Sequence, residues 1–255
     1  MPSSDRRFNM ISDGHTHISE INDSSLLLKE TESFDLMIES AYDPLGFERC
    51  VSFAEEHENV YCTVGVHPQF ALRYDNGTAR KIESLLAGRK VAGIGEIGLD
   101  KTFPFYEVQK TVFAAQLTLA SLHDVPVVLH TRRAFDDTFE ALKTIRPGKA
   151  LFHGFSGSTE TAKRILSGGF FIGIGHIVLL KNSVKIKEAL KYIPLDKIIL
   201  ETDGKAIGPD ERKLSSSAMI LNIAEIVSRI KDISTDNVLD TSYNNLKTFF
   251  DIKES

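Results

Sequence analysis

The chain has 255 residues, of which 42% are hydrophobic and 25% are charged, and its formal net charge at pH 7 is −5. This length and apolar content are sufficient for a substantial core, and we expect residues 1–255 to form a single domain. A mildly acidic protein has no general attraction for nucleic acid, so any recognition of phosphate must come from a local site.

Cysteine content and apolar segments limit the compartments to be considered. Cys50 and Cys62 are too few for a disulfide framework, and we interpret them as buried thiols of a protein from a reducing compartment. The basic N-terminal residues are not followed by the apolar stretch of a signal peptide. The most apolar segment, FFIGIGHIVLL, is too short to cross a bilayer. We therefore expect a soluble, cytoplasmic protein with no membrane partner and no obligate protein partner.

Short runs of apolar and β-branched residues recur along the whole chain, in the manner of strands buried on both faces of a parallel sheet. Helical periodicity separates them, most clearly in 106–123 and 215–233, where apolar residues are spaced by three and four. The connection at 18–33 is short and has one clear apolar turn. The eight predicted strands are 8–17, 34–41, 60–68, 91–100, 125–131, 149–157, 169–175 and 197–204.

Eight strands that alternate with helices predict a single TIM barrel, that is, a (β/α)₈ barrel of the α/β class. An open, doubly wound sheet is the alternative. The number of strands and the polar residues at their ends favour the barrel.

Nearly every predicted strand ends in a side chain that can bind a metal or carry a proton. In a barrel the carboxyl ends of all strands meet at one rim, where active sites are built. Residues far apart in the sequence are therefore expected to converge on one pocket. They are His15, His17, His67, Glu96, His130, His153, Glu201 and Asp203.

His15 and His17 are two residues apart, so their side chains lie on one face of the strand and can share a metal. Alone, this spacing is equally compatible with two hydrogen-bonded polar residues. The acidic and histidine residues at other strand ends favour the metal.

The acidic residues of the rim have separate expected roles. Glu96 lies among glycines and apolar residues, where a lone carboxylate is costly unless it is paired or binds metal. A carboxylate on this strand can bridge two ions; the alternative is a salt bridge to an arginine. Asp203 can bind metal and accept a proton from water, or cap a turn. We interpret Glu201 as support for a ligand histidine and His67 as a substrate contact or a supporting residue.

Six short motifs occur in a fixed order between about Ser12 and Asp203: DGHTH, VGVHP, GEIGLD, VVLHTR, FHGFSG and ETD. Together they resemble the TatD family of metal-dependent hydrolases, which belongs to the amidohydrolase-like barrels. NNLKTFF near the C-terminus is similar to the last helix of that family. Each motif is weak alone, but six in order are highly specific.

The resemblance implies one or two divalent metal ions, zinc or manganese in preference, with magnesium as the alternative. One ion would be held by His15, His17, Glu96 and Asp203, and the other by Glu96, His130 and His153. It also implies phosphodiester hydrolysis by metal-activated water, with Asp203 and Glu96 as catalytic residues and DNA or another phosphodiester as substrate. TatD-family relatives are commonly deoxyribonucleases that act from the 3′ end.

The sequence departs from the family pattern around the rim. Gly204 and Lys205 replace the usual Ser-Pro after ETD, and Lys101 begins a changed segment after GLD. Lys101, Arg132, Arg133 and Lys205 are candidate phosphate contacts, or alternatively solvated surface charges.

Three other functions remain open at this point. One is an amidohydrolase-like enzyme that hydrolyses a C–N or ester bond of a small metabolite. Another is a phosphoesterase of the polymerase-and-histidinol-phosphatase type, against which the later motifs argue. The last is a non-catalytic binding scaffold, which the full ligand set disfavours.

Overall fold

The computed structural model describes residues 10–21, 24–204 and 216–253. Its strands form one parallel sheet in which each strand pairs with the next along the chain, which confirms the predicted TIM barrel. All eight strands fall within or next to the predicted runs. They are β1 (Ser12–Thr16), β2 (Leu36–Ala41), β3 (Val60–Val64), β4 (Val91–Asp100), β5 (Val127–Arg132), β6 (Ala150–Phe152), β7 (Phe171–Ile174) and β8 (Ile198–Leu200).

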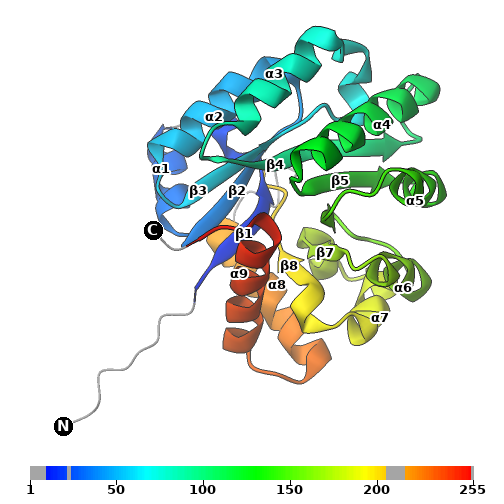
Figure 1. The fold of residues 1–255 in the computed structure, drawn as a ribbon. Coiled ribbons are helices and arrows are strands. Elements are labelled where there is room, and N and C mark those ends of the chain that lie inside the picture. Colours follow the sequence, from blue (N-terminus) through cyan, green and yellow to red (C-terminus); the bar gives the residue numbers. More distant parts are fainter. Residues whose placement is uncertain (1–9, 22–23, 205–215, 254–255) are drawn as a thin grey trace.

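Helices follow the strands and surround the sheet (Figure 1). The two clearest predicted helices are present as α4 and α8, and the connection at 18–33 contains more helix than the single predicted turn. The α-helices are α1 (Ser24–Glu32), α2 (Phe47–Glu56), α3 (Asn76–Leu86), α4 (Tyr106–His123), α5 (Phe135–Thr144), α6 (Thr159–Ser167), α7 (Val184–Tyr192), α8 (Ser216–Lys231) and α9 (Thr235–Phe250). Short 3-10 helices are η1 (Ile18–Glu20), η2 (Pro44–Gly46), η3 (Pro68–Arg73), η4 (His176–Leu179) and η5 (Leu195–Lys197).

The first and last strands meet through side-chain and main-chain hydrogen bonds. The Asp13 carboxylate accepts hydrogen bonds from the Thr202 amide (3.0 Å) and the Thr202 hydroxyl. Just beyond them, the Asp203 amide donates to the His15 carbonyl (2.9 Å). These bonds hold the end of β8 beside β1 and so bring the two edges of the sheet together.

The barrel interior divides into an apolar half and a polar half. Residues two apart on a strand share a face, and Ile38, Val128, Leu151 and Ile199 form one buried cluster with Phe249 of α9. This cluster lies toward the amino ends of the strands. Two residues further along each of these four chain segments stands a polar side chain, in the order Ser40, His130, His153 and Glu201. Thus α9 packs against the apolar half and the carboxyl ends are left for polar groups.

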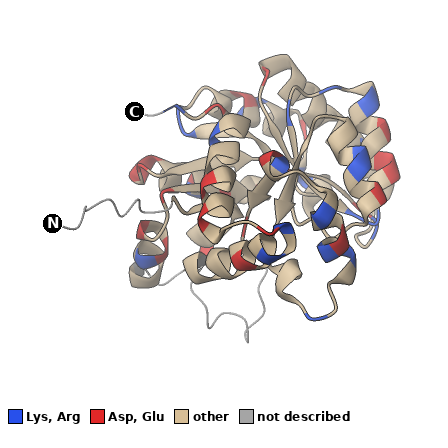
Figure 2. Ribbon diagram, turned by 90° about the horizontal axis from the view of Figure 1, so that it is seen from below, with Lys and Arg blue, Asp and Glu red and all other residues tan. Residues whose placement is uncertain are grey.

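Basic and acidic residues alternate along the helices that surround the sheet (Figure 2). This mixture of charges agrees with the modest net charge of −5. Within the described ranges, no helix combines the length and apolar character needed to cross a membrane.

Candidate metal centre

Glu96 lies at the centre of a group of histidines supplied by different strand ends. Its Oε1 atom is 2.8 Å from both His130 Nδ1 and His153 Nε2. Its Oε2 atom is 3.5 Å from His15 Nε2 and 3.6 Å from His17 Nε2. The structure therefore brings together five residues from four segments that are far apart in the sequence.

Asp203 completes this group from the segment that follows the last strand. Its Oδ1 atom is 3.6 Å from His17 Nε2. The residue has a left-handed backbone conformation, with φ of 57°, which aspartate tolerates better than most residues. All six predicted metal ligands thus face one space at the carboxyl ends of the strands.

The ring of His17 has a defined orientation that suits a metal. Its Nδ1 atom lies 2.7 Å from the Ser40 carbonyl. Because a carbonyl only accepts, Nδ1 carries the proton and Nε2 presents a lone pair. That lone pair faces His15 Nε2 at 3.1 Å and the carboxylates of Glu96 and Asp203. A space surrounded by nitrogen lone pairs and carboxylate oxygens fits a divalent cation.

His130 is held between two carboxylates. Its Nδ1 atom faces Glu96, and its Nε2 atom lies 3.1 Å from Asp100 Oδ2 at the end of β4. A carboxylate on the outer nitrogen fixes the orientation and basicity of a ligand histidine. The close approach of β4 to β5 depends on Gly98. The φ of Gly98 is 151°, and a Cβ there would lie 1.9 Å from the His130 carbonyl oxygen.

His153 and Glu201 form a buried pair on the opposite side of the centre. His153 lies just after β6, and its Nδ1 atom is 3.8 Å from Glu201 Oε1. Glu201 Oε1 accepts a hydrogen bond from the Gly154 amide. Glu201 therefore lies beside the ring nitrogen of His153 that does not face Glu96. Gly173 makes room for it, since a Cβ there would lie 2.3 Å from Glu201 Oε2.

The charges of the centre are strongly coupled. Burial alone would raise the pKa of Glu96, but electrostatic interactions with His153 and His67 and a hydrogen bond from His130 hold that pKa well below its usual value. Burial opposes a proton on His153, yet Glu96 raises the pKa of His153 to about 10. Burial and the nearby His153 lower the pKa of His15 to about 4. A carboxylate that stays ionised in a buried site is the state needed to bind a cation.

His67 lies directly beside the Glu96 centre. Its side chain is buried, and its Nε2 atom is 3.7 Å from Glu96 Oε1. Burial lowers the pKa of its ring to about 4. Among the residues that the structure describes, two groups of three each have ligand atoms that all lie within 4.8 Å of one another: His15, His17 and Glu96, and also His67, Glu96 and His130. Geometry therefore makes His67 a further candidate ligand.

The predicted phosphate contacts are less closely connected to the centre. Lys101 follows β4 and forms an ion pair with Asp137 (2.6 Å). Arg132 ends β5 and, like Arg133, is exposed at the rim. Lys205 lies outside the described residues.

Three supporting residues were missed by the sequence reasoning. Asp100 contacts His130, while Ser40 contacts both His17 and His15, its Oγ atom being 3.0 Å from His15 Nδ1. Asp13 joins the two strands that carry His15 and Asp203. Asp13 and Asp100 lie within the DGHTH and GEIGLD motifs, and Ser40 lies near the carboxyl end of β2, but a polar residue at such a position does not reveal which ring it will contact.

Comparison with known proteins gives consistent results across sequence and structure. The family model described as TatD related DNase matches residues 12–251. The uncharacterized metal-dependent hydrolase YabD of Bacillus subtilis is 28% identical over 254 residues, covering 95% of this chain and 100% of that protein. The 3′-5′ ssDNA/RNA exonuclease TatD of Erwinia tasmaniensis is 33% identical over 184 residues, covering 69% of this chain and 71% of that protein.

Among solved structures, the TatD homologue YjjV of Escherichia coli K12 is similar over nearly the whole chain. The TM-score is 0.85 at 25% sequence identity, and the alignment covers 95% of this chain and 98% of that one. The sequence matches and the shared fold span the same residues that form the Glu96 centre.

Proposed function

The chain belongs to the TatD-related DNase family of metal-dependent hydrolases, and from this premise we propose that it hydrolyses phosphodiester bonds of single-stranded nucleic acid. The observation that carries the proposal is the position of Glu96 between four histidines from three other strand ends. A shared carboxylate among nitrogen ligands is suited to hold two cations a few ångströms apart, an arrangement that recurs in phosphoryl-transfer enzymes.

The proposed ligands form two overlapping sets. His15, His17, Glu96 and Asp203 would hold one ion, and Glu96 with His130 and His153 would hold the second. This mixture of imidazole and carboxylate favours zinc or manganese over calcium, with magnesium as the alternative. When bound, such ions supply an activated water and neutralise charge on phosphoryl oxygens.

The protein groups have separate proposed tasks. Asp203 is the least buried carboxylate of the centre, with a side chain 21% exposed, and it would accept the proton of the attacking water. Glu96 would belong to both ligand sets and so fix their positions relative to each other. Asp100 and Glu201 would orient the rings of His130 and His153.

Substrate would reach the centre from the open, carboxyl end of the barrel. His67 borders the centre, and Lys101, Arg132 and Lys205 are proposed contacts for flanking phosphates, which would supply positive charge that the protein as a whole lacks. The family match covers nearly the full chain, and we propose that residues 1–255 act as one domain.

A substrate panel tests this proposal. Metal-loaded protein is incubated with single-stranded DNA, an aryl phosphodiester, and a set of amides and lactones. We expect turnover of the first two, reduced about 10²- to 10⁴-fold in Asp203→Asn and retained in Asp136→Asn, a control for an exposed aspartate of α5. Hydrolysis of only the amides or lactones would instead assign the protein to C–N or ester bonds of small metabolites.

A further inference from the structure

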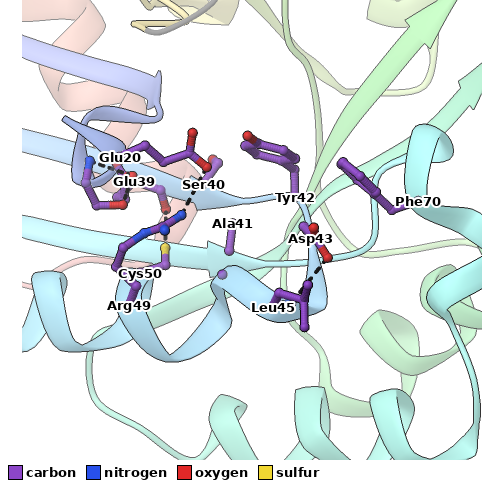
Figure 3. Close-up of a pocket in the computed structure, with 12 residues that line it drawn as sticks. Glu20, Glu39, Ser40, Ala41, Tyr42, Asp43, Leu45, Arg49, Cys50 and Phe70 are labelled. Atoms are coloured by element: carbon purple, nitrogen blue, oxygen red, sulfur yellow. Dashed lines mark hydrogen bonds and ion pairs between the residues drawn. The ribbon is translucent and has the colours of Figure 1, made fainter. Parts of the chain in front are cut away.

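A cavity of about 430 Å³ lies beside the metal centre, at the carboxyl end of β2. Residues of η1, β2, η2, α2 and η3 line it, as Figure 3 shows. The volume falls in the range of sites that hold one small molecule, roughly 300–1,000 Å³.

This cavity and the metal centre share a wall. Ser40 lines the cavity, while its carbonyl and hydroxyl contact His17 and His15. Tyr42 also lines the cavity, and its ring packs edge-on against His17 with centroids 4.9 Å apart. A group bound in the cavity would therefore lie next to whatever is bound at His17.

One side of the cavity is aromatic. The rings of Tyr42 and Phe70 are stacked, with centroids 5.8 Å apart and an angle of 28° between planes. Both side chains are only partly buried, and Figure 3 shows them side by side in the cavity wall. Leu45, which is 81% exposed, extends this apolar surface. Aromatic faces open to a cavity are suited to stack against a planar ligand.

The charged groups of the lining are already satisfied within the protein. Arg49 pairs with Glu20 (3.0 Å). Asp43 accepts hydrogen bonds from the Leu45 amide and from Arg73. Glu39 accepts from two amides, at 3.0 Å each, and from the Ser19 hydroxyl (2.6 Å). A wall whose charged groups are already paired or hydrogen-bonded in this way favours an uncharged ligand over a phosphate.

We propose that this cavity, the β2 cavity, binds the terminal nucleoside of the substrate strand, with its base against Tyr42 and Phe70 and its 5′-phosphate at the metal centre. The inference rests on the proposed function and deepens it. In hydrolysis the water oxygen bonds to phosphorus, and the bond to the 3′-oxygen of the preceding nucleotide breaks. That oxygen leaves with a proton, and the terminal nucleotide departs as its 5′-monophosphate.

Two phosphodiesters with the same p-nitrophenyl leaving group test the subsite kinetically. Thymidine 5′-(p-nitrophenyl phosphate) carries a nucleoside, whereas methyl p-nitrophenyl phosphate does not. We expect wild type to prefer the first in kcat/KM, and Tyr42→Ala to lower this preference about 10-fold or more, since stacking contributes that much per base. Tyr42→Phe, which keeps the ring, and Tyr192→Ala, which removes an exposed ring of α7, should keep the preference. An unchanged preference in Tyr42→Ala would overturn the subsite.

A binding measurement separates failure of the subsite from failure of the proposed function. Thymidine 5′-monophosphate and 2-deoxyribose 5-phosphate are titrated by calorimetry into the full chain in EDTA. Tighter binding of the thymidine nucleotide, lost in Tyr42→Ala and kept in Tyr42→Phe, supports the subsite even if neither ester is hydrolysed. Equal affinity of both ligands for wild type would contradict it.

Discussion

The two halves of the barrel interior are built by the same chain segments, yet one half is apolar and the other contains ionisable side chains. Toward the amino ends, Val128 and Leu151 pack with Phe249 in a fully buried apolar cluster. Two residues further along, His130 and His153 lie 2.8 Å from the Glu96 carboxylate. Strand periodicity places both members of each pair on the same inward face.

The difference separates the half of the interior that stabilises the fold from the half that contains the proposed metal ligands. The apolar half gains free energy by burial and close packing. The polar half buries ionisable groups, which opposes folding unless they are paired or bind a cation. Substitutions in the polar half should therefore affect activity most, and substitutions in the apolar half should affect stability most.

The largest expected effect is on activity, in the polar half. Glu96→Gln keeps the shape of the side chain and removes the charge shared by four histidines. We expect kcat/KM for a phosphodiester to fall by roughly 10³-fold or more, because both proposed ligand sets lose their common carboxylate. The control is Glu107→Gln, whose side chain is 81% exposed. A loss of less than 10-fold would remove Glu96 from the proposed mechanism.

The next effect concerns stability, in the apolar half. Leu151→Ala should lower the free energy of unfolding by about 2–5 kcal/mol, because it leaves a cavity in a fully buried cluster. Urea unfolding measures this, with Leu122→Ala in an exposed position of α4 as the control, expected within about 0.5 kcal/mol of wild type. The kcat of the folded variant should stay within a few-fold. A stable but inactive Leu151→Ala variant would contradict the expectation that the apolar half affects stability more than activity.

The last expected effect is a change of stability with pH, and it isolates the cost of a buried charge near the centre. Burial raises the pKa of Glu39 to about 7, although His17 opposes this. The folded state thus holds its proton up to about pH 7, while the unfolded chain releases it near its ordinary value of 4.5. Stability relative to Glu39→Gln should therefore fall as pH rises from 4.5 through 7, by about 3 kcal/mol in total.

Urea unfolding of wild type and Glu39→Gln at pH 5 and pH 8, in EDTA, checks this sign. The exposed variant Glu107→Gln should show no such trend. A difference between wild type and Glu39→Gln that stays constant with pH would show that Glu39 titrates normally in the folded state.

Most of the fold could be predicted from the sequence because buried parallel strands leave continuous apolar runs. The run at 91–100 coincides with β4. α1 was harder to predict, since Leu26 and Leu28 are 43% and 49% exposed and form no continuous apolar stripe. The contact between α9 and the barrel interior joins the end of the chain to its earlier strands, and no local pattern encodes it.

The convergence of the six proposed ligands could also be predicted, because the carboxyl ends of barrel strands share one rim. The orientation of the histidine rings could not be predicted. Asp100 contacts His130 only because β4 and β5 approach closely at Gly98, and Ser40 reaches His15 across neighbouring strands. The cavity beside Tyr42 depends on η2 and η3, whose packing leaves no periodic signal in the sequence. The metal-binding and catalytic roles themselves stay predictions.

The most direct test of the central claim is a crystal structure of the full chain soaked in Mn²⁺, with an anomalous difference map. We expect a strong peak within about 2.0–2.3 Å of His15 Nε2 and His17 Nε2, bordered by Glu96, and we expect that peak to be absent from a Glu96→Gln crystal. A map whose peaks all lie away from Glu96, or one with no peak at saturating Mn²⁺, would contradict it.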